Sequence, residues 1–127
     1  MAERDQATIV AFSKALELIN EARNTNNGKN QPGREFILWK SAAEAEYLAF
    51  RIAMVHGLGD YEPPEDGENQ LSLDSAHNLL EAAEACLISD PRRAYTKVRQ
   101  AVSMLRRMYA AEARVGGRHR GASLRNE

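Results

Sequence analysis

The chain has 127 residues, which is enough for one domain whose hydrophobic core needs no metal or disulfide to hold it. Its net charge of −1 excludes an overall field that would draw the whole molecule to nucleic acid or to a membrane surface. The sequence has no run of eighteen apolar residues and no second cysteine beside Cys86. We therefore expect no membrane span, no internal disulfide and a cytoplasmic location.

The first predicted helix covers residues 3–23. Apolar side chains recur every three or four residues from Ile9 to Ile19, which is typical of a helix with one buried face. The Asn- and Gly-rich segment 24–30 then ends this helix, because these residue types favour turns and loops.

The second predicted helix, residues 34–57, is apolar most of the way round. One broad face runs from Ile37 to Val55, and a second face is largely aromatic. A helix of this kind is either the central element of a bundle or is shared with a second chain. We therefore expect a homodimer or a helical partner, and the alternative is that the aromatic face is simply core. The expected interface residues are Trp39, Tyr47, Phe50 and Met54.

The third predicted helix follows an acidic loop at residues 60–70, which lacks the ligand spacing of a calcium loop. Ser72 or Asp74 caps this helix, and its apolar stripe runs from Leu73 to Leu87. Asp90 then caps a fourth helix, with Pro91 at the first helical position. The short connection between these two helices predicts an antiparallel hairpin.

The fourth predicted helix, residues 90–115, is basic on the side opposite its apolar stripe. We expect Gly116-Gly117 to end it, which leaves one domain at 1–115 and a flexible basic tail at 116–127. Residues 1–89 carry 7 Lys and Arg against 15 Asp and Glu, whereas residues 90–127 carry 10 against 3. This asymmetry indicates nucleic acid or an acidic protein as a partner for the basic end. The alternatives are that the arginines serve solvation alone or are neutralised by the acidic part of the chain. The expected phosphate-contacting residues are Arg92, Arg93, Arg99, Arg106, Arg107, Arg114, Arg118 and Arg120.

Arg51 and His56 form the short pattern Arg-x4-His, whose residue types suit a catalytic mechanism. The pattern resembles the motif of the HEPN domains, which are helical bundles that often dimerise and in many cases cleave RNA. The resemblance implies that the histidine assists proton transfer while the arginine holds the phosphate. It covers six residues, and Ile52 stands where the family usually has a polar residue. Five helical positions also set the two side chains about 140° apart around the helix axis.

Together these elements predict an all-α, four-helix, up-down-up-down bundle with a flexible basic C-terminal tail. Phosphate-binding loops, nucleophile elbows and zinc-ligand spacings are missing from the sequence, so we expect no catalytic residue, no cofactor and no metal. The expected function is that of a non-enzymatic small subunit or adaptor with a basic last helix. The alternatives are a ribonuclease that uses Arg51 and His56, and a protein–protein interaction module that uses the aromatic face.

Overall fold

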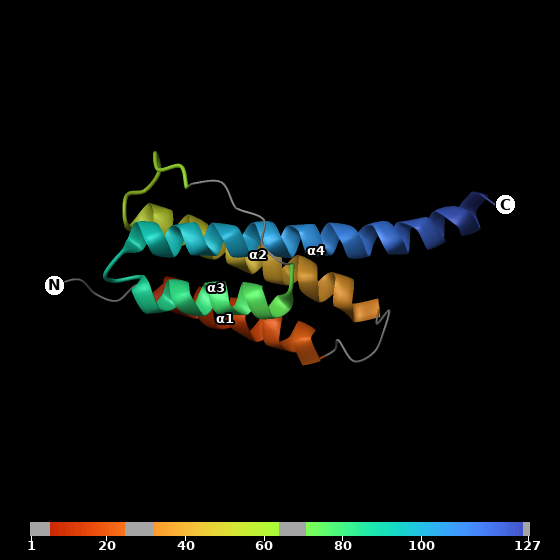
Figure 1. Ribbon diagram of the computed structural model, residues 1–127, viewed down its shortest axis with the longest axis horizontal. Helices are drawn as coiled ribbons and strands as arrows, with labels where there is room; N and C mark the ends of the chain where they lie inside the picture. Colours follow the sequence, from red (N-terminus) through yellow and green to blue (C-terminus); the bar gives the residue numbers. More distant parts are fainter. Residues whose placement is uncertain (1–5, 25–31, 64–70, 126–127) are drawn as a thin grey trace.

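The computed structural model describes residues 6–24, 32–63 and 71–125, with the side chains of α4 described as far as Arg114. Four helices make up most of these ranges: α1 (Gln6–Asn24), α2 (Pro32–Val55), α3 (Leu73–Cys86) and α4 (Pro91–Arg125) (Figure 1). No strand occurs in the described residues, and none of their helices has the length and apolar character needed to cross a membrane. The predicted all-α four-helix bundle is confirmed. Residues 25–30 of the expected Asn-rich loop and residues 64–70 of the expected acidic loop lie outside the described residues.

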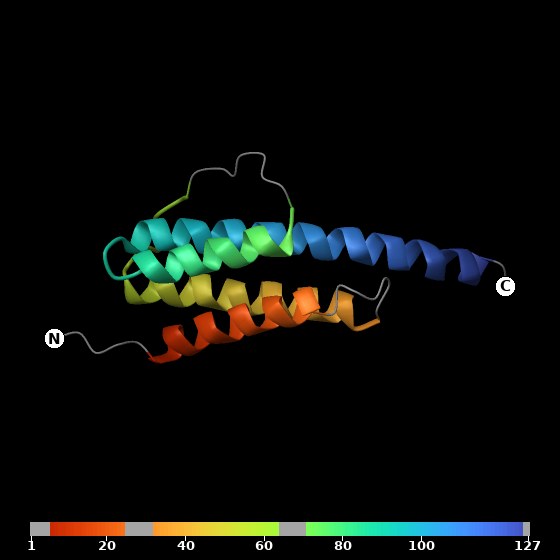
Figure 2. The same cartoon turned by 60° about the horizontal axis from the view of Figure 1, so that its bottom comes forward.

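Each helix packs mainly against two others. Both α1 and α4 contact α2 and α3, so α2 and α3 occupy opposite corners of the bundle, and α1 and α4 occupy the other two (Figure 2). Apolar side chains from all four helices fill the space between them. The largest fully buried ones include Phe12, Ile19, Leu38, Leu48, Ile52, Leu80 and Leu105.

The direction of α3 differs from the expected alternation. Arg23, at the end of α1, pairs with Asp74 at the start of α3, so these two helices are antiparallel. Arg34, at the start of α2, pairs with Glu112 in the later part of α4, so those two are antiparallel as well. The order is therefore up-down-down-up, and both α2 and α3 run from right to left in Figure 1.

The long connection between α2 and α3 permits this order. Seventeen residues lie between Val55 and Leu73. At about 3.3 Å per extended residue, they reach well beyond the roughly 21 Å length of the 14-residue α3. The chain thus returns to the other end of the bundle before α3 begins, as in other four-helix bundles with one crossover connection.

The starts of α3 and α4 follow the capping residues in the sequence. The Ser72 hydroxyl accepts a hydrogen bond from the Ser75 backbone N–H at 3.0 Å, and the Asp90 carboxylate accepts one from the Arg93 N–H at 3.2 Å. Each bond satisfies a backbone donor that has no partner within its own helix. Gly57 follows the end of α2 with a φ of 67°, a left-handed conformation that glycine adopts readily. Of the two cap residues predicted for α3, Ser72 is confirmed and Asp74 is not, and Asp90 is confirmed as the cap of α4.

The end of α4 was predicted wrongly. The helix passes through Gly116-Gly117 and continues to Arg125, and it projects beyond the other three helices (Figures 1 and 2). Glycine within a helix costs about 1 kcal/mol relative to alanine, so it disfavours a helix without forbidding one. The residues that follow include Arg, Ala and Leu, which are good helix formers. The flexibility of segment 116–127 stays a prediction.

Candidate interaction surfaces

The solvent-facing side of α2 is largely apolar from Phe36 to Val55, with Lys40 as its one exposed charged residue. The opposite side of the same helix packs into the bundle, where Leu38, Leu48 and Ile52 are fully buried. The two apolar faces expected from the sequence are thus one core face and one surface. We call this surface the aromatic strip. Its members recur every three or four residues, and the large ones are about half exposed: Phe36 (59%), Trp39 (52%), Ala43, Tyr47 (45%), Phe50 (60%) and Met54 (52%).

The first turns of the aromatic strip are ordered by aromatic contacts. The rings of Phe36 and Trp39 stack with their centroids 6.2 Å apart, and the Lys40 ammonium lies 5.3 Å from the Phe36 ring centroid. Lys40 is the one charged side chain among the exposed residues of α2 that the structure describes. Phe36 is absent from the interface residues expected from the sequence, although its spacing of three residues from Trp39 was a signal that could have included it.

The outward side of α4 has the opposite chemistry. We call it the arginine face, and all six of its members are exposed or half-buried. Between Pro91 and Arg114 the sequence has a single carboxylate, Glu112, whose partner is Arg34 of α2 at 3.3 Å. The arginine face therefore carries no carboxylate of its own to neutralise it. Its members are Arg92, Arg93, Arg99, Arg106, Arg107 and Arg114.

Two of these arginines are engaged by other parts of the bundle. Arg106 forms an ion pair with Glu46 of α2, and the Arg92 guanidinium lies 5.4 Å from the Tyr61 ring centroid. The other four form no ion pair with any residue that the structure describes; they are Arg93, Arg99, Arg107 and Arg114. The backbones of Arg118 and Arg120 belong to α4, and their side chains lie outside the described residues.

Tyr61, in the described part of the connection between α2 and α3, contacts the start of α4 at one end of the arginine face. The Tyr61 hydroxyl is 3.1 Å from the Thr96 hydroxyl, and the Tyr61 ring meets Tyr95 edge to face. The neighbouring carboxylates, Asp60 and Glu62, are exposed and pair with none of the described arginines. The described contacts of Tyr61 therefore involve the start of α4, and residues 64–70 of the connection lie outside the described residues.

The aromatic strip and the arginine face adjoin one another. A groove of about 310 Å³ separates them, lined from α2 by Trp39, Ala42, Ala43 and Glu46 and from α4 by Arg106 and Tyr109. This adjacency follows from the packing of α2 on α4, and nothing in the sequence alone indicated it. The protein therefore has one continuous two-part surface along the α2–α4 edge of the bundle.

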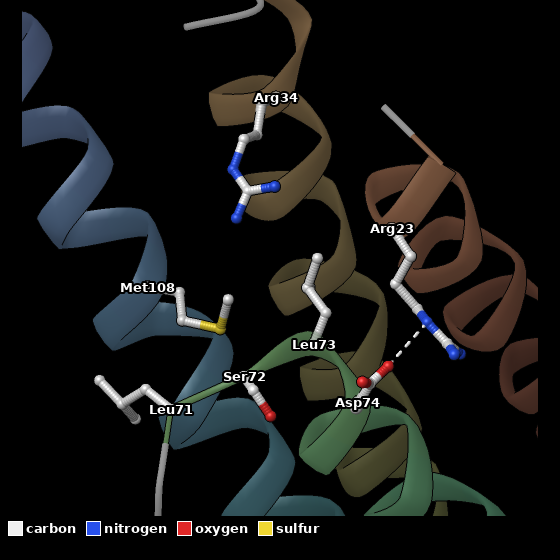
Figure 3. Close-up of a pocket in the computed structure, with 7 residues that line it drawn as sticks. All are labelled: Arg23, Arg34, Leu71, Ser72, Leu73, Asp74 and Met108. Carbon is white, nitrogen blue, oxygen red and sulfur yellow. Dashed lines mark ion pairs between the residues drawn. The ribbon is translucent and has the colours of Figure 1, made fainter. Parts of the chain in front are cut away.

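A second hollow, of about 440 Å³, lies where α1 ends and α2 and α3 begin (Figure 3). In it the Arg23 guanidinium lies 3.0 Å from the Asp74 carboxylate, and Arg34 is paired with Glu112 as described above. Both arginines already have carboxylate partners, so the hollow offers no surplus positive charge to an anion. We interpret it as the junction of helix ends. Its lining residues are Arg23, Arg34, Leu71, Ser72, Leu73, Asp74 and Met108.

The two residues of the Arg-x4-His pattern lie in different environments. Arg51 is half-buried on α2, whereas His56 is exposed just beyond the end of the helix. The His56 N–H donates to the Ile52 carbonyl at 3.0 Å, so helical geometry continues to His56 and the separation of about 140° applies. The pair does not share a helix face, and the ribonuclease alternative stays a prediction.

Metal-ligating and nucleophilic side chains are dispersed over the described part of the chain. No three His, Cys, Asp or Glu residues gather there in a way that could hold a metal ion. His77 and Glu81 lie 3.5 Å apart on one face of α3. Cys86 is half-buried beside the core, with its sulfur 3.7 Å from the Ala83 carbonyl oxygen. Both contacts lie within α3 and join it to no other helix.

Comparison with known proteins adds no functional information. No protein-family model matches the chain, and neither a curated protein nor a solved structure matches it. The aromatic strip and the arginine face are therefore the features of this protein from which a function can be inferred.

Proposed function

We propose that this protein is a non-enzymatic binding module whose arginine face contacts the phosphates of nucleic acid. The observation that carries the proposal is the set of four arginines without a described ion-pair partner on a side of α4 that has no carboxylate. A guanidinium group binds a phosphate with two parallel hydrogen bonds. From Arg92 to Arg114 the helix advances about 33 Å, comparable with one turn of B-form DNA. Contacts of this kind are sensitive to salt and largely independent of sequence.

Fluorescence-anisotropy titration of labelled RNA and DNA at several salt concentrations tests the proposal. We would compare the wild-type protein with a variant that carries Arg99→Gln, Arg107→Gln and Arg114→Gln. These three arginines have no described ion-pair partner, so their replacement breaks no salt bridge between the residues that the structure describes. We expect the slope of log K against log salt to become shallower by about 0.7–0.9 for each phosphate that the variant no longer binds.

A control variant with Arg4→Gln, Lys14→Gln and Lys29→Gln removes the same charge from residues 1–89. We expect the control to keep the wild-type salt dependence. Equally weakened binding in both variants would mean that only net charge attracts the nucleic acid. Absence of binding at low salt would contradict the proposal, and capture of an acidic protein instead would reassign the arginine face to that partner.

A second candidate function is favoured by the aromatic strip, namely self-association or the binding of a helical partner. Monomeric proteins rarely expose a continuous apolar patch of more than a few hundred Å². Light scattering over a range of concentrations measures self-association directly. We expect Trp39→Ala to weaken it and added salt to leave it nearly unchanged. A monomer at every concentration, together with no helical partner in pull-downs, would contradict this function.

We further propose that the module acts in the cytoplasm. Cys86 is the one cysteine of the sequence, so no disulfide forms within this chain, as is usual where thiols stay reduced. The location of a fluorescent fusion protein checks this directly.

A further inference from the structure

We infer that the aromatic strip pairs with the same strip of a second copy in antiparallel orientation, and that this pairing turns both arginine faces to one side of the dimer. The inference rests on the self-association proposed above. It adds to that proposal a partner, a register and a twofold axis, and it connects the aromatic strip to the nucleic-acid contact.

The size of the strip fits a second copy of the chain. Aromatic side chains bury roughly 150–250 Å² each when fully covered, so five half-exposed large side chains offer on the order of 500 Å². A standard interface takes about 800 Å² from each partner, including a polar rim. Lys40 and Glu44 lie at or beside the strip and can supply part of such a rim, and the exposed Val55 extends the apolar area. A small peptide would leave much of a strip of about five helical turns uncovered.

One antiparallel register covers the whole strip. A twofold axis near residue 45 sets Phe36 against Met54 of the second copy and Ala43 against Tyr47, and each contact occurs twice, as a twofold interface requires. Ala43, the smallest side chain of the strip, then packs against Tyr47, one of the largest. The register also brings Lys40 to the Phe50 ring of the second copy. That contact is of the same kind as the one Lys40 already makes with Phe36 at 5.3 Å.

A parallel pairing is less favourable on three counts. Each residue would face its own copy, which sets Lys40 against Lys40 and places two like charges together. Two copies of Ala43 would also face each other between large aromatic layers and leave a gap. Finally, the dipoles of parallel helices repel, whereas those of antiparallel helices attract.

The packing of the bundle then determines where the arginine faces point. Because α1 and α4 occupy the two corners beside α2, the outward side of α4 points roughly at right angles to the aromatic strip. A twofold axis perpendicular to two antiparallel helices exchanges the protomers and keeps both α4 helices on the same side. Interhelical distances of 8–10 Å then put the two α4 axes roughly 20–25 Å apart. The dimer presents one basic surface of double width, whereas a parallel dimer would turn the two arginine faces in opposite directions.

Cysteine cross-linking tests the register. In a Cys86→Ser background, Phe36→Cys and Met54→Cys would be prepared as separate proteins with different tags, mixed in equal amounts and mildly oxidised. Positions 36 and 54 are about 27 Å apart along one helix, far beyond the Cα separation of about 4.4–6.8 Å that a disulfide requires. We expect the mixed disulfide to exceed either self-disulfide by about fivefold or more.

A third variant keeps the strip intact. Lys40→Cys lies about 15 Å from its own copy in the antiparallel register and close to it in a parallel one, so we expect it to form little disulfide. Self-disulfides at positions 36, 54 or 40 would overturn the inference in favour of parallel pairing. A dimer by light scattering that forms no disulfide at any of these positions would overturn the register. A monomer at every concentration would instead remove the proposed self-association itself.

Discussion

The helices α2 and α4 lie side by side, and they expose opposite chemistry to the solvent. Among the described exposed residues of α2, Lys40 is the only charged one, whereas those of α4 include five arginines and no carboxylate. The exposed residues of α1 are mixed, because they include Ser13, Lys14 and Glu17 beside the apolar Ile9 and Val10. A mixed surface of this kind is usual for a solvent-exposed helix. The largely apolar surface of α2 and the largely basic surface of α4 are not. The α2–α4 edge therefore exposes an apolar strip beside a basic face, a combination that α1 does not have.

The largest expected effect is a difference in the free energy of unfolding between substitutions on the buried and the exposed face of α2. Leu48→Ala removes a fully buried side chain and is expected to lower the free energy of unfolding by about 2–5 kcal/mol. Phe50→Ala removes an exposed ring, and we expect a change within about 0.5 kcal/mol in protein dilute enough to be monomeric. Urea unfolding followed by circular dichroism measures both values. Similar destabilisation of the two variants would mean that the aromatic strip belongs to the core.

The pattern of apolar residues predicted the four helices, and the Ser and Asp residues before them predicted two caps. The pattern could not show which face of α2 is buried. In α4 the apolar and basic residues occupy separate sides, so periodicity alone identified the buried stripe from Ala94 to Leu105. In α2 both sides are apolar, and only the positions of the neighbouring helices decide which one is buried. Trp39 and Leu38 are adjacent in the sequence and equally hydrophobic in type, yet Trp39 is half exposed and Leu38 is fully buried.

The contacts between helices were beyond sequence reasoning for a different reason. The direction of α3 depends on how the connection from 56 to 72 is routed, and the length of that connection permits either direction. The pairing of Arg106 with Glu46, and the groove that joins the aromatic strip to the arginine face, depend on that routing. Six of the predicted phosphate-contacting arginines have described side chains and lie on the outward side of α4, but their neighbours on α2 were not foreseen.

A charged residue within the aromatic strip is expected to weaken nucleic-acid binding without touching an arginine. Phe50→Glu should prevent dimerisation, because pairing would bury its carboxylate in an apolar interface. If the dimer joins two arginine faces, the slope of log K against log salt should fall to roughly half in the monomer. Anisotropy titration measures the slope. Ser13→Glu on α1 adds the same charge away from the strip and is expected to leave the slope unchanged. An unaltered slope in Phe50→Glu would show that nucleic-acid binding does not depend on self-association.

A smaller effect is expected at the glycine pair in α4. Gly116→Ala and Gly117→Ala together should strengthen the projecting part of the helix, since each substitution raises helix propensity by about 1 kcal/mol. Circular dichroism should show more helix and no change in the unfolding of the core. Ala110→Gly, at an exposed position of the same helix, is the reverse control and should lower the helix signal. No gain from the two alanines would mean that the glycines do not limit this part of the helix.

The smallest effect concerns the ion pair at the boundary of the two surfaces. Glu46→Gln releases Arg106, and we expect nucleic-acid affinity to rise about twofold at low salt. Both side chains are about half exposed, so stability should change by no more than about 0.5 kcal/mol. Glu17→Gln on α1 removes the same charge at a distance and should raise the affinity less. An equal rise in both variants would assign the effect to net charge.

The crossover from α2 to α3 also has a consequence for the conformational entropy of the chain. It joins two helical hairpins, and the cost of closing such a connection rises by only about 0.6 kcal/mol for each doubling of its length. The connection from Leu87 to Asp90 is short and holds α3 against α4. We therefore expect the crossover to accept the insertion of a whole folded domain after Pro63, beyond the contact of Tyr61 with α4, while both hairpins still assemble.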